Sequence, residues 1–215
     1  GNGQSEMAAV ITGLTRFQTG EISLRGRRIQ GLSAADIREL GVGVIPEDRR
    51  RRGLVQKMSV GENFMLGILR RREFSRSYGV FSRACRDFVR RKAGEFDIRF
   101  ASPSQPASSL SGGNQQKVIL ARELSGNPAL LVACQPVRGL DVGAEKFVHQ
   151  KLREAKNQGA ALLLISADLE EVLESSDRVG ILFNGRIVRE FRPGELNLQQ
   201  IERYMTGICE GDAWA

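Results

Sequence analysis

The sequence predicts an α/β fold that carries a mostly helical subdomain. Two short, continuous apolar runs, Ala129–Ala133 and Ala160–Ile165, are typical of strands buried in a parallel sheet. Between them, Ala144–Asn157 has the apolar spacing of a helix, so the three segments are expected to form a β-α-β unit. The middle of the chain, in contrast, has mainly helical patterns. An α/β core with a helical subdomain accounts for both regions.

The boundaries of the predicted subdomain follow from where this pattern changes. We expect an α/β core over residues 1–52 and 126–215, and a helical subdomain over residues 53–125. The chain opens on a glycine-rich loop, and the strand that should lead into such a loop is missing. We therefore expect one or more N-terminal strands of the core to lie upstream of Gly1.

Local signals predict the remaining elements. Ser59 and Glu62 have the spacing of a capping box, and Asn184-Gly185 between two apolar runs predicts a hairpin with a type I′ turn. The other expected elements are a helix to about Thr12, a strand over Thr19–Leu24, a helix from Ser33 to Leu40, a strand over Val42–Ile45, helices from Ser59 to Leu69, over Phe81–Phe96 and over Val118–Leu124, strands over Val179–Phe183 and Arg186–Phe191, and a helix over Glu195–Met205.

Composition bounds the function classes. The 215 residues are 41% hydrophobic, which is enough for a packed core, and no apolar run approaches the ~20 residues that cross a bilayer. The three widely spaced cysteines suit a reducing compartment better than a disulfide framework or a zinc site. The net charge of +7 is concentrated at Arg49–Arg52 and Arg70–Arg72, with few aromatic residues nearby. A solvated basic face is therefore favoured over a surface that stacks nucleic-acid bases.

The octapeptide Leu-Ser-Gly-Gly-Asn-Gln-Gln-Lys at residues 110–117 is the most informative motif. Two glycines let backbone amides approach a ligand closely, and Ser111 adds a hydroxyl. The motif is expected to be a turn that runs into the helix Val118–Leu124. The N-terminus of a helix has unpaired N–H groups and partial positive charge, which favour phosphate. The octapeptide resembles the signature motif of ATP-binding-cassette (ABC) ATPases.

Three further motifs extend this resemblance to nearly the whole chain. Pro46–Val55 and Met58–Asn63 are similar to segments that follow the third strand in the second ATP-binding domain of tandem ABC ATPases from simple-sugar and nucleoside importers. Arg138–Ala144 resembles the D-loop segment of the family, and the run from Gln135 to Asp141 is most similar to the nucleoside branch. The resemblance implies a P-loop NTPase core and ATP as the ligand.

The phosphate-binding loop departs from the family pattern. A Walker A loop reads G-x-x-x-x-G-K-[ST], in which the lysine reaches the phosphates and the hydroxyl binds Mg²⁺. Here Gln4 stands where the lysine belongs, Ser5 could still meet a metal, and Glu6 adds a charge that repels polyphosphate. The degenerate loop comprises Gly1, Asn2, Gly3, Gln4 and Ser5.

Four other positions also depart from the family pattern. Cys134 occupies the Walker B aspartate position, and a thiol is a poor ligand for a hard cation. Gln135 replaces the catalytic glutamate and cannot act as a general base. Ala167 replaces the switch histidine, and Glu47 replaces the Q-loop glutamine. No intact catalytic residue or metal ligand set is therefore expected on this side, and whether the chain itself is an enzyme stays open.

The resemblance implies a division of labour between two cassettes. The signature would complete an ATP site whose Walker loop belongs to a partner, either a first ATP-binding domain in tandem on the same polypeptide or a second copy, with ATP and Mg²⁺ mainly at that composite site. The residues expected to face the partner's ATP are Ser111, Gly112, Gly113 and Gln115, with Asp141 at the interface between the two cassettes. Membrane permease subunits would contact the Glu47–Asn63 region on the cytoplasmic face of the membrane, and a solute-binding protein would take part indirectly.

Two alternatives stay open at this point. One is a catalytically active ABC ATPase with unusual motifs, which turnover by the pure chain would favour. The other is a nucleic-acid-associated ABC protein that uses its basic clusters, which steeply salt-dependent DNA or RNA binding would support. The scarcity of aromatic residues argues against the second, and no nucleic-acid partner is expected.

Overall fold

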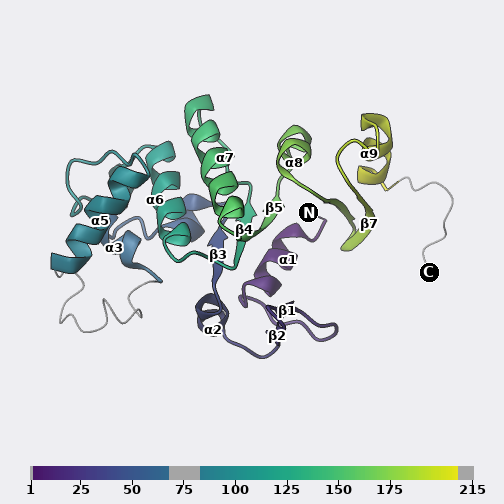
Figure 1. Cartoon of the computed structure of the whole chain (residues 1–215), viewed down its shortest axis with the longest axis horizontal. Helices are drawn as coiled ribbons and strands as arrows, with labels where there is room; N and C mark the ends of the chain where they lie inside the picture. Colours follow the sequence, from purple (N-terminus) through teal and green to yellow (C-terminus); the bar gives the residue numbers. More distant parts are fainter. Residues whose placement is uncertain (1, 68–82, 208–215) are drawn as a thin grey trace. The chain divides into compact units, whose positions relative to one another are not determined.

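The computed structural model describes residues 2–67 and 83–207. The degenerate-loop residue Gly1, the basic cluster Arg70–Arg72, Cys209 and the predicted helix ends at Leu69 and Phe81 lie outside these residues. The chain divides into two compact units: a first unit of residues 1–34 with 164–215, and a second unit of residues 35–163. Figure 1 follows the elements of both units along the chain. In the part of the chain that is described, no helix is both long enough and apolar enough to span a membrane.

The second unit contains a sheet with the strand order β3-β4-β5. β3 (Val42–Ile45) pairs in parallel with β4 (Leu130–Cys134), and β5 (Ala161–Ile165) ends at the boundary with the first unit. The helix α7 (Val142–Asn157) connects β4 to β5, so the elements of the predicted β-α-β unit are present. The helix α2 (Ala34–Glu39) precedes β3. The carboxyl ends of β3 and β4 therefore lead into the segments that hold Glu47 and Gln135.

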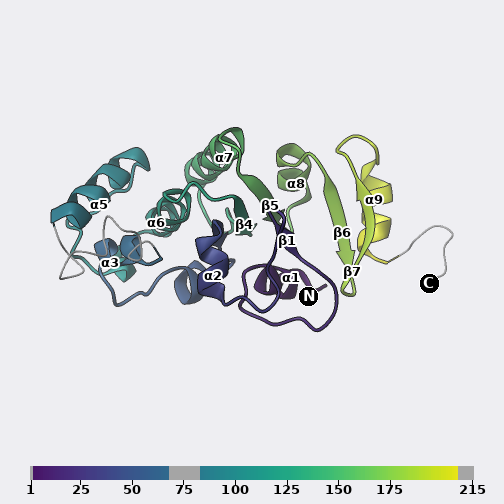
Figure 2. The same cartoon turned by 60° about the horizontal axis from the view of Figure 1, so that its bottom comes forward.

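Helices form the rest of the second unit. Within the described residues, its remaining elements are a π-helical turn η1 (Arg49–Gly53), α3 (Val60–Met65), α5 (Arg83–Glu95), a 3-10 turn η2 (Ala107–Ser109) and α6 (Gly112–Leu124). The predicted capping box is confirmed, because Ser59 and Glu62 exchange hydrogen bonds at the start of α3. Figures 1 and 2 both show α3, α5 and α6 lying close together. Phe64, Val89 and Ile119, one from each helix, are fully buried there.

The helix α6 contributes eight buried residues to this unit. Its apolar run Val118–Ala121 is fully buried, and its last turn holds a buried ion pair. The carboxylate of Glu123, whose side chain is 1% exposed, accepts from Nε of Arg122 at 2.7 Å and Nη2 of Arg38 at 3.0 Å. It also accepts from the backbone N–H of Val44 in β3 at 3.2 Å. Glu123 therefore fixes the end of α6 to β3 and α2.

The first unit has two hairpins and three helices within its described residues. Its elements are α1 (Gln4–Ile11), β1 (Ser23–Leu24), β2 (Arg27–Arg28), α8 (Leu169–Ser175), β6 (Val179–Phe183), β7 (Arg186–Phe191) and α9 (Leu198–Met205). Val179, Ile181, Phe191 and Ile201 form a buried apolar cluster between the β6–β7 hairpin and α9. The predicted type I′ turn is confirmed, because Asn184 and Gly185 have φ of 46° and 78°.

Several predicted boundaries need correction. The predicted strand over Thr19–Leu24 is reduced to Ser23–Leu24, which pairs only with a two-residue strand. The signature helix begins at Gly112 rather than Val118, so the two glycines belong to its first turn. The predicted helical subdomain, residues 53–125, lies within the second unit together with β3 and β4, and its limits stay a prediction.

Candidate functional site

The N-terminus of α6 presents the signature residues. Ser111 is the N-cap, and its hydroxyl oxygen accepts from the backbone N–H of Asn114 at 3.4 Å and from Nδ2 of Asn114 at 3.1 Å. Gln115 N–H donates to the Ser111 carbonyl at 2.9 Å. By helix geometry, the N–H groups of Gly112 and Gly113 have no acceptor inside the helix. With an exposed serine beside them, these amides can donate to an anion from outside the chain.

Gln115 is placed differently from the sequence expectation. Its side chain was expected to face a partner's ATP, but the residue is 1% exposed, and Nε2 donates to the Ala107 carbonyl at 3.1 Å. One residue beyond, Nε2 of Gln116 donates to the Pro136 carbonyl at 2.7 Å. The side chain of Gln115 therefore lies on the buried face of α6 and points toward η2. The half-buried Asn114, which sequence reasoning did not select, lies beside Ser111 instead.

Arg49 lies between the signature and the D-loop segment. Its Nη1 donates to the Arg138 carbonyl at 2.8 Å, and its Nη2 donates to the Gly139 carbonyl at 3.3 Å. A Cβ added at Gly112 would lie 2.9 Å from Nη2 of Arg49. Sequence reasoning grouped Arg49 with the exposed basic residues that follow it, but the structure turns its side chain inward. The only sequence signal for this was its place within the Pro-Glu-Asp-Arg motif at residues 46–49.

Asp141 is the N-cap of α7. Its Oδ1 accepts from the backbone N–H of Ala144 at 2.9 Å, which leaves Asp141 exposed at the helix end. A Cβ added at Gly113 would lie 3.4 Å from Cβ of Ala144 and 4.0 Å from Oδ2 of Asp141. The first turns of α6 and α7 are thus packed against each other, and the signature and the D-loop residue form one continuous surface.

The end of β4 holds residues unsuited to metal binding. Burial, with a smaller contribution from the Glu47 carboxylate, raises the pKa of the Cys134 thiol to about 11. The thiol is therefore neutral at physiological pH. The next residue, Gln135, has a left-handed backbone with φ of 48°, and the carboxylate of Glu47 pairs with Arg138. Mg²⁺ prefers oxygen ligands, so the thiol at position 134 does not fit a magnesium ion.

The segment predicted to be a degenerate phosphate loop belongs to the first unit. Gly3 has φ of 104° and precedes α1, and Oε1 of Gln4 accepts from the Asn2 N–H at 3.0 Å. The Asn2 carbonyl accepts from the Gly185 N–H at 2.9 Å in the β6–β7 turn. The side chain of Gln4 thus accepts a hydrogen bond from the Asn2 N–H, a backbone donor that a phosphate-binding loop would offer to its ligand. Ser5 is exposed on the first turn of α1, where it stays a possible metal contact.

The predicted switch position, Ala167, is also in the first unit. Ala167 is exposed between β5 and α8 and has no side chain that could polarise a water molecule or a phosphate. The neighbouring Asp168 is engaged as the N-cap of α8, accepting from the N–H groups of Glu170 and Glu171 at 3.0 and 3.2 Å. No cluster of three or more His, Cys, Asp or Glu side chains suited to a metal ion occurs among the residues the structure describes.

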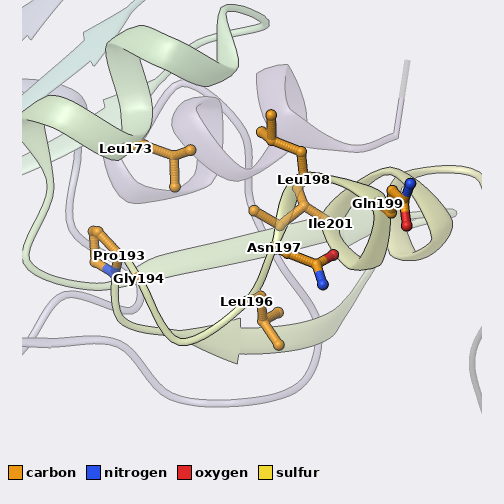
Figure 3. A pocket seen from close by; sticks show the side chains of 8 residues that line it. All are labelled: Leu173, Pro193, Gly194, Leu196, Asn197, Leu198, Gln199 and Ile201. Carbon is orange, nitrogen blue, oxygen red and sulfur yellow. The ribbon is translucent and has the colours of Figure 1, made fainter.

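A pocket in the first unit is unrelated to these motifs. Figure 3 shows it between α8 and the segment that leads into α9. Its lining residues are Leu173, Pro193, Gly194, Leu196, Asn197, Leu198, Gln199 and Ile201. The lining has no charged or nucleophilic side chain, so the pocket does not supply chemistry.

Comparison with known proteins agrees with this arrangement. The family model described as ABC transporter matches residues 1–138. The chain belongs to the ABC transporter family. The solved ATP-binding cassette MJ0796, in a dimeric post-hydrolysis state bound to ADP and Pi, matches 91% of this chain and 82% of its own with a TM-score of 0.74 at 21% identity. The cassette MJ1267 matches 96% of this chain and 83% of its own with a TM-score of 0.76 at 22% identity. The predicted fold class is confirmed.

Curated relatives are closer in sequence. The chain is 42% identical over 214 residues to the guanosine import ATP-binding protein NupO of Bacillus subtilis (strain 168), covering 99% of this chain and 42% of that protein. It is 42% identical over 208 residues to the nucleoside import ATP-binding protein NupA of Lactococcus lactis, covering 96% and 41%. The ribose import ATP-binding protein RbsA 2 of Rubrobacter xylanophilus follows at 39% over 209 residues, covering 97% and 40%. The chain spans about two fifths of the length of these relatives.

Proposed function

We propose that this chain is an ATP-binding cassette domain of a nucleoside importer, and that its signature completes an ATP site on a partner cassette while its own Walker residues are catalytically silent. The observation that carries the proposal is an asymmetry between the two sets of motif residues. The first turn of α6 offers free amides beside an exposed serine, whereas the Walker B position holds a neutral thiol.

The signature side supports anion binding from outside the chain. Ser111, Gly112 and Gly113 lie at the N-terminus of a 13-residue helix, where amides and the helix dipole favour the terminal phosphate of ATP. Asp141 lies on the same surface, which suits contact with a second cassette. In this proposal the partner's Walker residues hold ATP with Mg²⁺, and this chain contributes N–H donors. The buried Gln115 has a packing role.

The other side lacks the groups that phosphoryl transfer needs. Gln4 cannot neutralise phosphate charge, and Cys134 does not offer a ligand for Mg²⁺. Gln135 and Ala167 cannot activate or orient a water molecule by accepting its proton. Each change removes a different contribution to catalysis, so restoring one is not expected to be sufficient.

The permease partner is proposed to bind the segment after β3. Val55 and Met58 are 45% and 38% exposed there, next to the exposed side chains of Arg50, Arg51 and Arg52. Asn63 is fully buried beneath this loop, where its side chain bonds to the backbone of Val55, Met58 and Ser59. A rigid loop with exposed apolar tips and basic flanks suits docking on a protein surface. In this proposal the cassette lies on the cytoplasmic face of the membrane, and a solute-binding protein takes part indirectly.

The assignment of nucleosides as cargo is supported by the relatives. The two relatives at 42% identity are a guanosine and a nucleoside import protein, and the ribose import relative follows at 39%. Because those relatives are more than twice as long, the first cassette, either in tandem or as a second copy, is part of the proposal. Nucleoside uptake by cells that carry or lack the assembled importer tests the cargo.

A substitution in the first turn of α6 tests the division of labour. In an importer assembled from this cassette, its partner and the permease, Gly112→Asp should lower ATP turnover by about a hundredfold, because a carboxylate would face the partner's γ-phosphate. Gly94→Asp is the matched control, since Gly94 lies in α5 with open space around an added Cβ. Gln135→Ala should leave turnover nearly unchanged. A severe loss of turnover in Gln135→Ala, with little effect of Gly112→Asp, would contradict the proposal. It would mean that the chain's own Walker side takes part in catalysis and its signature does not.

A further inference from the structure

Arg49 connects three motif segments that are distant in sequence. Its guanidinium donates to the carbonyls of Arg138 and Gly139, 2.8 and 3.3 Å away, immediately before the D-loop residue Asp141. The same guanidinium covers Gly112 in the first turn of α6. Two donors of one planar group thus span two consecutive carbonyls, an arrangement that a single ammonium group cannot reproduce.

The backbone of Arg49 is anchored to the signature helix itself. Arg49 begins η1, and Asp48 caps this turn by accepting from the N–H groups of Arg50 and Arg51 at 3.0 Å each. At the end of η1, a Cβ added at Gly53 would lie 2.5 Å from Cδ1 of Ile119, so the turn packs directly on α6. Arg49 therefore reaches the D-loop segment from a base that is fixed to α6.

The contact with Gly112 gives this glycine a second reason to be small. A side chain at position 112 would displace the guanidinium, because its Cβ would lie 2.9 Å from Nη2 and 3.5 Å from Cζ of Arg49. Nε of Arg49 is buried and has no hydrogen-bond partner. The guanidinium is thus partly desolvated, and its favourable contacts are concentrated in the two carbonyls.

The remaining contacts close a loop around the same segment. Before Asp141 in the sequence, the carboxylate of Glu47 pairs with Arg138, whose carbonyl accepts from Arg49. After Asp141, Ala144 packs against Gly113. All these contacts are made by groups of this chain. None requires nucleotide or metal bound to this cassette.

We propose that Arg49 is a positioning residue that aligns the signature turn with the D-loop segment before ATP binds. The inference rests on the proposed function, because it assumes that this surface meets a partner's ATP. Without Arg49, ATP would have to order the two segments on binding, and the ordering cost would reduce its apparent affinity. Once ATP saturates the site, the segments reach the same arrangement. Removal of the Arg49 side chain should therefore raise the half-saturating ATP concentration more than it lowers maximal turnover.

The assembled importer provides the test, with ATP turnover measured across ATP concentrations. Arg49→Ala should raise the half-saturating concentration by about tenfold and change saturated turnover by less than about twofold. Arg49→Lys should restore little of this, because lysine keeps the charge but cannot span both carbonyls. Arg153→Ala, which removes an exposed arginine from α7, is the charge-matched control and should behave like the wild type.

Each outcome decides between the claims. Wild-type half-saturation in Arg49→Ala, full rescue by Arg49→Lys, or a loss confined to maximal turnover would each overturn the inference. If Arg49→Ala prevents assembly of the importer, the test uses Arg49→Lys alone. A raised half-saturating ATP concentration in Arg49→Lys would then support the inference, and an unchanged one would reject it. Sensitivity to Gly112→Asp with no effect at Arg49 would reject only this inference. Insensitivity to Gly112→Asp would reject the proposed function.

Discussion

The carboxylate of Glu47 helps to raise the pKa of the Cys134 thiol at the end of the central strands. Burial is the main cause that raises the pKa of Cys134 to about 11, and the negative charge of Glu47 raises it further. Glu47 follows β3 and Cys134 ends β4, so parallel pairing of these strands brings the two positions to the same edge of the sheet. Burial and the charge of Glu47 therefore act together to keep the Cys134 thiol neutral.

The first prediction concerns the reactivity of Cys134 with an alkylating reagent. Only the thiolate reacts, and a pKa of about 11 leaves roughly one thiol in a thousand ionised at pH 8, against about one in four for an unperturbed cysteine. Alkylation of the folded chain by iodoacetamide, followed by peptide mapping at Cys134, should be slow at pH 8 and should rise up to pH 10. Glu47→Gln should move this profile slightly to lower pH. A profile centred near pH 8.5 would contradict the raised pKa.

The second prediction concerns hydrolysis by the chain alone. The purified chain should release no phosphate from Mg-ATP above background, because Gln4, Cys134 and Gln135 replace groups with separate roles. Cys134→Asp should also stay at background, since it restores one metal ligand and neither the phosphate-binding cation nor the base. Phosphate release is measured against a mock preparation from cells that lack the chain. Turnover that co-purifies with the chain through several columns would support an active ATPase instead.

Sequence reasoning identified most elements, because their signals are local. The hairpin Val179–Phe191 was predicted with its correct turn, since Asn-Gly is one of few dipeptides that accept two positive φ angles. The capping box at Ser59 and the strand Val42–Ile45 were found for similar reasons. The start of α6 was missed because two glycines lower helix propensity, whereas the Ser111 cap and packing against Arg49 and Ala144 stabilise the helix from Gly112.

These local signals could not predict the orientation of side chains. Four consecutive arginines, 49–52, are equivalent in a sequence, but the π-helical turn directs only the first toward the D-loop segment. The resemblance to ABC ATPases implied a ligand contact for Gln115, but its side chain is buried because α6 packs against η2. Both placements come from contacts between residues more than five positions apart in the chain.

The third prediction concerns the buried carboxylate at the end of α6. Glu123→Ala should lower the free energy of unfolding by about 3 kcal/mol, because it leaves the buried Arg122 and the Val44 N–H without their acceptor. Glu174→Ala, on an exposed position of α8, is the control and should change stability by less than about 0.5 kcal/mol. Urea unfolding followed by circular dichroism measures both. Equal stability of the two variants would show that the Glu123 network contributes nothing.

The last prediction concerns docking on the permease. Arg51 is 88% exposed, and it lies with Arg50 and Arg52 beside the exposed Val55 and Met58. Replacing the three arginines by alanine should weaken association with permease subunits and make it less sensitive to salt, because the basic rim of the surface is removed. The control is an equal loss of charge on α7, with Lys146, Arg153 and Lys156 replaced by alanine. Co-purification of the permease with each variant at two salt concentrations measures the effect. If both triple variants retain the permease equally, the docking surface lies elsewhere on the cassette.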